Sequence, residues 1–180
     1  MIYLFLANGF EEVEALATVD FLRRCDLDVT TVGIGGEYIT GSHAITVKAD
    51  VSDENLQTHE DAQAVILPGG MPGTLNLEHN ETVQCFIDYA VENNLLLCAI
   101  CAAPSILGHK GLLDGKRATC FPGFETQLGT AEYTGTPVEV DGTIITSKGA
   151  GCALQFARAI AEKLVSTAKA DKVWSSMQCD

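Results

Sequence analysis

Cys101 is the residue of this sequence whose setting best suits nucleophilic chemistry. It directly follows an apolar run, residues 95–100, with the length and character of a strand buried on both faces. Pro104 comes three residues later, and proline suits a first helical turn because its missing N–H would have no partner there. The sequence therefore predicts a sharp strand-to-helix turn at Cys101. Its sulfur would lie beside free backbone N–H groups, where a thiolate is favoured.

Two other features follow predicted strands. Glu11, Glu12 and Glu14 open a predicted helix, and a Pro-Gly-Gly segment occupies residues 68–70. Carboxyl groups can transfer protons, and glycines allow the close approach of backbone amides that an oxyanion site needs. The pattern alone also allows simpler interpretations. Acids at a helix start are normally solvated and complement the helix dipole, and residues 68–70 are compatible with an ordinary turn.

The other six cysteines are expected to have no role in chemistry. Cys179, next to the carboxyl terminus, is predicted to be exposed. The other five are predicted to be small buried hydrophobes: Cys25, Cys85, Cys98, Cys120 and Cys152. Cys98 and Cys101 spell C-x-x-C, but residues three apart in a strand are about 10 Å distant, beyond disulfide reach. Seven cysteines without framework spacing favour reduced thiols in a cytoplasmic protein.

No metal or nucleotide cofactor is predicted. The histidines show no metal-binding spacing, and no second C-x-x-C completes a zinc site; surface or structural roles are expected for His43, His59, His79 and His109. The glycine-containing segments at residues 8–10 and 149–151 match neither a dinucleotide fingerprint nor a P-loop.

Strand-like and helix-like segments alternate along the chain, and this alternation must position Cys101 and the acids. Strands are predicted at residues 2–7, 28–32, 62–67, 95–100, 117–120, 138–140 and 143–147, helices at 11–24, 81–92, 104–108, 152–165 and 167–177, and a small hairpin within 37–47. Such alternation predicts an α/β fold with a mostly parallel sheet covered by helices on both faces. Without a repeat or linker, residues 1–180 are expected to form a single domain.

Composition excludes several partners. A net charge of −13 would repel phosphates, so a nucleic-acid partner is not expected. No stretch approaches the roughly 20 apolar residues of a membrane span, and the first residues lack the features of a signal peptide. An apolar content of 47% over 180 residues predicts a compact fold with a sizeable core.

The sequence resembles the ThiJ/PfpI superfamily, and within it the parkinsonism-associated protein deglycase subfamily with its bacterial relatives. Four ordered motifs spread over nearly the whole chain carry the resemblance: Leu-Ala-Asn-Gly-Phe-Glu-Glu-Val-Glu at 6–14, Leu-Pro-Gly-Gly at 67–70, Ala-Ile-Cys-Ala-Ala-Pro at 99–104 and Thr-Ser-Lys-Gly-Ala-Gly at 146–151. It implies a flavodoxin-like three-layer sandwich of the class I glutamine amidotransferase-like type, usually homodimeric, with the nucleophile elbow at Cys101.

The resemblance also implies site residues. Cys101 would be the reactive thiol, Glu14 the matching acid, and the backbone N–H groups of Gly70 and Ala102 an oxyanion pocket. Protease-like branches carry a histidine directly after the cysteine, where this chain has Ala102. Phe121 stands where some deglycase-type members have a second histidine. An intracellular peptidase is therefore less favoured, and thiazole-phosphate biosynthesis, suggested only by the family name, is ranked last.

The chemistry expected of Cys101 depends on its ionisation. A thiol of pKa about 8.5 is only roughly 3% ionised at pH 7, and lowering that pKa by about three units takes roughly 4 kcal/mol. A helix N-terminus contributes at most about 2 kcal/mol. We therefore expect Glu14 to be desolvated and protonated, and to donate its O–H to the Cys101 thiolate.

Two functions follow as predictions. The first is a cofactor-independent stress-response enzyme of the glyoxalase or protein deglycase type, in which Cys101 and Glu14 act on a small reactive carbonyl such as methylglyoxal. The alternative is a non-catalytic oxidative-stress sensor or holdase chaperone that uses oxidation of Cys101.

Overall fold

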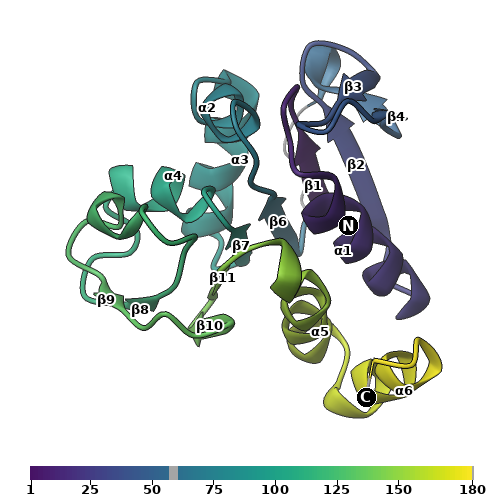
Figure 1. Cartoon of the computed structure of the whole chain (residues 1–180). Helices are drawn as coiled ribbons and strands as arrows, with labels where there is room; N and C mark the ends of the chain where they lie inside the picture. Colours follow the sequence, from purple (N-terminus) through teal and green to yellow (C-terminus); the bar gives the residue numbers. More distant parts are fainter. Residues whose placement is uncertain (57–60, 180) are drawn as a thin grey trace.

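A seven-stranded sheet forms the centre of the computed structural model, which describes residues 1–56 and 61–179 (Figure 1). Its order is β10-β11-β7-β6-β1-β2-β5. The strands in chain order are β1 (Ile2–Leu6), β2 (Val29–Gly33), β5 (Val51–Ser52), β6 (Ala64–Leu67), β7 (Leu96–Ile100), β10 (Val138–Asp141) and β11 (Ile144–Ser147). Neighbours pair in parallel except β10 with β11. The predicted mostly parallel sheet is confirmed.

Helices cover both faces of this sheet, so the chain forms the three layers that were predicted (Figure 1). One face is covered by α1 (Glu12–Arg24), α5 (Ala153–Leu164) and α6 (Thr167–Ser176), and the other by α2 (Gly73–Glu78), α3 (Glu81–Glu92) and α4 (Pro104–His109). Each face has its own buried core. Phe21 and Phe156 belong to the first, and Phe86 and Leu107 to the second.

Strand β7 separates these two cores because successive side chains of a strand point to opposite faces. Cys98 and Ile100 pack into the core beneath α1 and α5, whereas Leu97 and Ala99 pack into the core beneath α3 and α4. All five residues of β7 are buried. The sequence prediction of a strand buried on both faces is therefore confirmed.

The helical period corrects one prediction about a cysteine. In α3, Val83, Phe86, Ile87 and Ala90 face the core. Cys85 lies between them in sequence but on the opposite face of the helix, and it is exposed. The expectation that Cys85 is a buried hydrophobe was wrong.

Short elements complete the fold. The predicted hairpin is present as β3 (Tyr38–Thr40) and β4 (Thr46–Lys48), and a separate parallel pair is formed by β8 (Arg117–Ala118) and β9 (Glu132–Tyr133). Single 3-10 turns are η1 (Asp53–Asn55), η2 (Glu125–Gln127) and η3 (Ala150–Cys152). Gly142 has a φ of 63° in the tight turn that joins the antiparallel strands β10 and β11, where a glycine adopts the left-handed region without strain.

Several predicted boundaries shift by one or two residues. α1 begins at Glu12 because Glu11 is its N-cap, and β8 ends at Ala118 because the Thr119 N–H donates to the Thr146 side chain. His59 lies outside the described residues. No helix of the described part of the chain combines the length and apolar character needed to cross a bilayer.

The order of the strands reverses between β1 and β6. The chain pairs β1 with β2 on one side and later returns to pair β6 with the other side of β1. In open parallel sheets such a reversal opens a crevice beyond the carboxyl ends of the strands. The loops after β1, β6 and β7 all emerge at this edge, so the fold gathers the acids, the glycines and Cys101 there.

Candidate active site

Cys101 occupies a tight turn between β7 and α4. Its φ is 66°, in the left-handed region that costs a non-glycine residue roughly 1–3 kcal/mol. Two backbone hydrogen bonds of 2.8 Å hold this conformation: the Cys101 N–H donates to the Ser147 carbonyl, and its own carbonyl accepts from the Phe121 N–H. Pro104 is the first residue of α4, as predicted. The side chain of Cys101 remains partly exposed.

Glu14 lies in the first turn of α1 and is 1% exposed. Its Oε2 accepts the Gly69 N–H at 2.8 Å, whereas Oε1 is buried with no conventional hydrogen-bond partner among the described residues. Burial raises the pKa of Glu14 to about 7, against the lowering effect of contacts with Cys101 and the Gly69 N–H, and the charge of Glu11 raises it further. The carboxyl group is therefore substantially protonated at neutral pH.

Gly69 brings these two side chains together. A Cβ atom at this position would lie 2.6 Å from the Cβ of Cys101 and 2.7 Å from Oε2 of Glu14. Real Cβ atoms do not approach other atoms so closely, so glycine is needed where β6 ends. The predicted proximity of Cys101 and Glu14 is thus present, although they are 87 residues apart in the sequence.

Three hydrogen bonds link the start of α1 to the loop after β6 in a closed ring. The Glu11 N–H donates to the Gly69 carbonyl at 2.9 Å, the Gly69 N–H donates to Glu14 at 2.8 Å, and the Glu14 N–H donates to Oε2 of Glu11 at 2.7 Å. Glu11 is therefore a helix cap. This ring of hydrogen bonds fixes the position of the Glu14 carboxyl group relative to the turn at Cys101.

The backbone N–H groups of Gly70 and Ala102 face the sulfur of Cys101. Burial raises the pKa of the thiol, and a charged Glu14 raises it further, whereas the two N–H groups lower it. When Glu14 carries the proton, the repulsion between two anions is absent and its O–H can donate to the sulfur. The two groups therefore titrate as a coupled pair, in which ionisation of one disfavours ionisation of the other. The structure places all four predicted site residues together; their roles in a reaction remain predictions.

Glu12 was expected to be solvated, and that expectation was wrong. Its side chain is buried, at 5% exposure, because the turn between β3 and β4 wraps around its carboxylate. Oε1 accepts the His43 N–H at 2.7 Å and Oε2 lies 2.8 Å from Nδ1 of His43. Nothing in the local pattern of residues 11–14 distinguishes Glu12 from a solvated acid, since its partners lie about 30 positions away.

The other cysteines differ from Cys101 in their surroundings. All seven thiols are free; Cys25, Cys98 and Cys120 are buried as predicted, whereas Cys152 and Cys179 are partly buried. Burial raises the pKa of the Cys98 thiol, so the C-x-x-C spacing pairs an inert thiol with Cys101.

Among the described residues, Glu11, Glu12 and His43 bring their polar atoms within 4.8 Å of one another. The hydrogen bonds that already occupy Glu12 identify this group as an ion pair.

The molecule thus combines a three-layer α/β fold with a partly exposed cysteine on a strand-to-helix elbow, beyond the reversal in strand order. These features define a flavodoxin-like protein whose candidate site is built around a cysteine. The sequence pattern of the DJ-1/PfpI family matches residues 1–163. The chain belongs to the DJ-1/PfpI family, as the resemblance predicted.

Individual relatives agree with this assignment. Protein dj-1beta of Drosophila melanogaster is 34% identical over 171 residues, which cover 93% of this chain and 91% of that protein. The crystal structure of Drosophila melanogaster DJ-1beta matches with a TM-score of 0.92 at 32% identity, over 98% of this chain and 96% of that chain. The flavodoxin-like fold is therefore confirmed.

Of two further relatives, one bears the name of an enzyme and the other is much longer than this chain. The glutathione-independent glyoxalase DJR-1.2 of Caenorhabditis elegans is 30% identical over 156 residues, 86% of this chain and 82% of that protein. Protein DJ-1 homolog B of Arabidopsis thaliana is 34% identical over 171 residues, which are 93% of this chain but 39% of that protein. The chain thus spans about two fifths of that relative's length.

Proposed function

We propose that this protein is a cofactor-independent enzyme that converts small α-oxoaldehydes, such as methylglyoxal, to 2-hydroxy acids. The observation that carries the proposal is the convergence of Cys101 and Glu14 on Gly69, with Glu14 at a pKa of about 7. A thiolate beside a neutral acid supplies a nucleophile and a proton donor in one pair. The similarity to a glutathione-independent glyoxalase supports the same class of reaction.

The first step is addition of the thiolate to the aldehyde carbon. A C–S bond forms, the electron pair of the C=O bond moves to oxygen, and that oxygen takes the proton of Glu14 to give a hemithioacetal. The N–H groups of Gly70 and Ala102, which face the sulfur, lie beside the carbon that it attacks. They would stabilise the developing oxyanion.

The second stage uses Glu14 as a base. Its carboxylate removes the proton from the carbon that now carries sulfur, and the resulting enediol is protonated on the neighbouring carbon to give a 2-hydroxy thioester. Water hydrolyses this thioester and regenerates the thiol. The sum is one α-oxoaldehyde plus one water to one 2-hydroxy acid, with no external oxidant or reductant. An early adduct of the same aldehyde with a protein amine would enter at the same carbon, as a deglycase requires.

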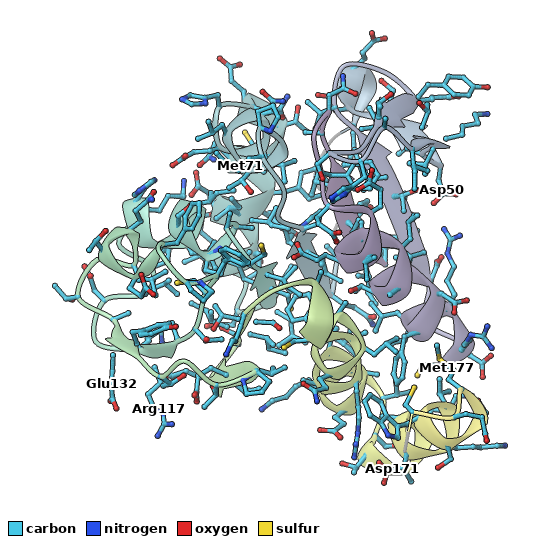
Figure 2. All side chains as sticks on the ribbon, viewed as in Figure 1. Asp50, Met71, Arg117, Glu132, Asp171 and Met177 are labelled. Carbon is cyan, nitrogen blue, oxygen red and sulfur yellow. The ribbon has the colours of Figure 1, made fainter. Side chains whose placement is uncertain are left out.

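The surroundings of the site suit a small, weakly polar substrate. Met71 directly follows Gly70, and Phe121 is hydrogen-bonded through its N–H to the Cys101 carbonyl. Both side chains are 47% exposed, and Figure 2 shows Met71 next to the ribbon of α2. An apolar rim of this kind favours an alkyl-substituted aldehyde over a charged one.

The test is consumption of methylglyoxal without glutathione by the wild-type protein and by Cys101→Ser. We expect the serine variant to lose at least about 100-fold in turnover, because a hydroxyl group near its ordinary pKa is a far weaker nucleophile than a thiolate. Cys85→Ser is the matched control, since Cys85 is an exposed thiol on α3. Unchanged activity in Cys101→Ser would overturn the proposal.

A second candidate is an oxidative-stress sensor, favoured by the partial exposure of Cys101 beside a protonated acid that can donate to a sulfinate oxygen. Peroxide titration followed by intact mass distinguishes the two. Early gain of about 32 Da at Cys101, two oxygen atoms, together with negligible methylglyoxal turnover supports sensing.

We also propose that two copies associate through the exposed side of α1. Val13 and Leu16 are 53% and 38% exposed there. Val13 borders a groove that continues to Leu154 and Met177, the latter at the end of α6 (Figure 2). A second copy, as the family resemblance implies, would cover this apolar surface. Light scattering of the wild-type protein measures the mass directly, and a monomer at micromolar concentration would contradict the proposal.

A further inference from the structure

The turn between β3 and β4 is fastened to the start of α1 by a buried carboxylate. Glu12 accepts the His43 N–H at 2.7 Å, the His43 ring at 2.8 Å and the Ser42 hydroxyl at 3.4 Å. A Cβ at Gly41 would lie 2.3 Å from Glu12, so only glycine leaves room for this carboxylate. The Ser42 N–H also donates to the Phe10 carbonyl at 2.8 Å. This set of contacts closes the turn over the residues that precede Glu14.

His43 reaches the ring of hydrogen bonds around the candidate site through Glu11. Its Nδ1 lies 4.0 Å from Oε1 of Glu11. The other oxygen of the same carboxylate accepts the Glu14 N–H, and the charge of Glu11 raises the pKa of Glu14. A positive charge on His43 therefore lies beside Glu11, and Glu11 is hydrogen-bonded to Glu14, the acid that contacts Cys101.

The charges that face His43 have one sign. Glu11 and Glu12, both at the start of α1, are the charged groups next to it among the described residues. Burial alone would raise the pKa of Glu12, but hydrogen bonds from the His43 ring and from the N–H groups of His43 and Ile45 lower it to about 2. Glu12 is consequently ionised at any physiological pH, and hydrogen bonding to it raises the pKa of His43.

We propose that His43 is a positioning residue of the candidate site: its imidazolium, held on Glu12 and Glu11, offsets the negative charge beside Glu14 and so favours ionisation of the Cys101–Glu14 pair. Losing one proton gives this pair a single negative charge. Anions at Glu11 and Glu12 disfavour that charge wherever it resides, and a cation at His43 opposes them. The inference rests on the proposed reactivity of Cys101, because it concerns the pH at which that reactivity appears.

The experiment measures the rate of alkylation by iodoacetamide against pH, followed by mass spectrometry on the peptide that contains Cys101. In His43→Gln, which is neutral but keeps a hydrogen-bond donor, we expect the midpoint of the profile to rise by roughly 0.3–0.5 pH unit at low salt. His43→Arg keeps a permanent cation and should keep the wild-type midpoint. At about 1 M salt the difference between the Gln and Arg variants should shrink, because His43 is exposed and its charge is screened.

The matched control is His109→Gln. His109 is likewise paired with a carboxylate, that of Glu78 at 2.5 Å, but this pair joins α4 to α2, not the turn between β3 and β4 to α1. The His109→Gln variant should leave the alkylation profile of Cys101 against pH unchanged. Superimposable profiles for wild type and His43→Gln would overturn the proposal. So would equal shifts in the Gln and Arg variants, or a shift that salt does not reduce, since these indicate a structural role of the turn.

Failure of the proposed enzyme function gives a different result. If the wild-type protein does not consume methylglyoxal but His43→Gln still raises the alkylation midpoint and His43→Arg does not, the inference about His43 is supported and only the reaction is excluded. Alkylation requires no carbonyl substrate, so the two readouts are independent.

Discussion

At the scale of single residues, the candidate site depends on where one proton resides. Cys101 and Glu14 are both buried enough that neither ionises easily, and a charge on one disfavours a charge on the other. The unpartnered Oε1 of Glu14 is the atom to which that proton can bind, since Oε2 already accepts the Gly69 N–H. A protonated Oε1 would donate a hydrogen bond to the sulfur. In that protonation state, the buried oxygen acquires a partner and the thiolate is stabilised.

Substitutions of Glu14 test this arrangement at the same scale. Glu14→Gln keeps a donor beside the sulfur, whereas Glu14→Ala removes it and leaves only the N–H groups of Gly70 and Ala102. A hydrogen bond to a charged group contributes about 1.5–3 kcal/mol, so we expect Glu14→Ala to raise the alkylation midpoint of Cys101 by about one to two pH units. Glu14→Gln should raise it less. An unmoved profile in Glu14→Ala would mean that the two groups do not interact.

At the scale of elements, the local features of the site were predictable and the long-range ones were not. The elbow at Cys101 could be inferred because an apolar run, small residues and Pro104 follow one another in sequence. Burial of Glu12 could not, because it results from the turn between β3 and β4 closing over α1. The two backbone hydrogen bonds that hold Cys101 likewise join the turn after β7 to the end of β11, at Ser147, and to the segment after β8, at Phe121. Neither long-range contact leaves a periodic pattern in the sequence.

The end of β6 provides a prediction at the element scale. In Gly69→Ala, the new methyl group would overlap Cys101 and Glu14, so β6 and the start of α1 must separate. Such overpacking typically costs about 1–3 kcal/mol, and we expect a lower melting temperature together with slower alkylation of Cys101. Differential scanning calorimetry and the alkylation assay measure the two effects.

The control for this substitution is Gly151→Ala. Gly151 lies in η3 with nothing within 4 Å of its added Cβ, so stability and alkylation should change little. If Gly69→Ala behaved like Gly151→Ala, the close convergence on Gly69 would be wrong.

At the scale of the whole molecule, two neighbouring buried acids oppose each other in their effect on stability. The pKa of Glu12 is about 2 in the folded protein, below its value of 4.5 when unfolded, so its ionisation favours folding above pH 4.5 and this contribution is lost as the pH falls toward 2. The pKa of Glu14 is about 7, above its unfolded value, so the unfolded state loses its proton first. Stability then decreases as the pH rises from 4.5 to 7.

The two acids therefore predict maximal stability in mildly acidic solution, and their substitution should change the pH profile in opposite directions. For Glu14 the shift of about 2.5 units, from 4.5 to about 7, corresponds to roughly 3 kcal/mol. Glu14→Gln should thus be more stable than wild type at pH 8, by up to that order, with the advantage gone near pH 4. Glu12→Gln should be less stable than wild type at pH 7, with the gap closing toward pH 2. Urea unfolding at each pH measures both differences. Because Asp50 and other carboxyl groups also titrate in acid, the comparison is between variants at one pH; parallel profiles for both variants and wild type would show that neither acid has the ionisation assigned to it.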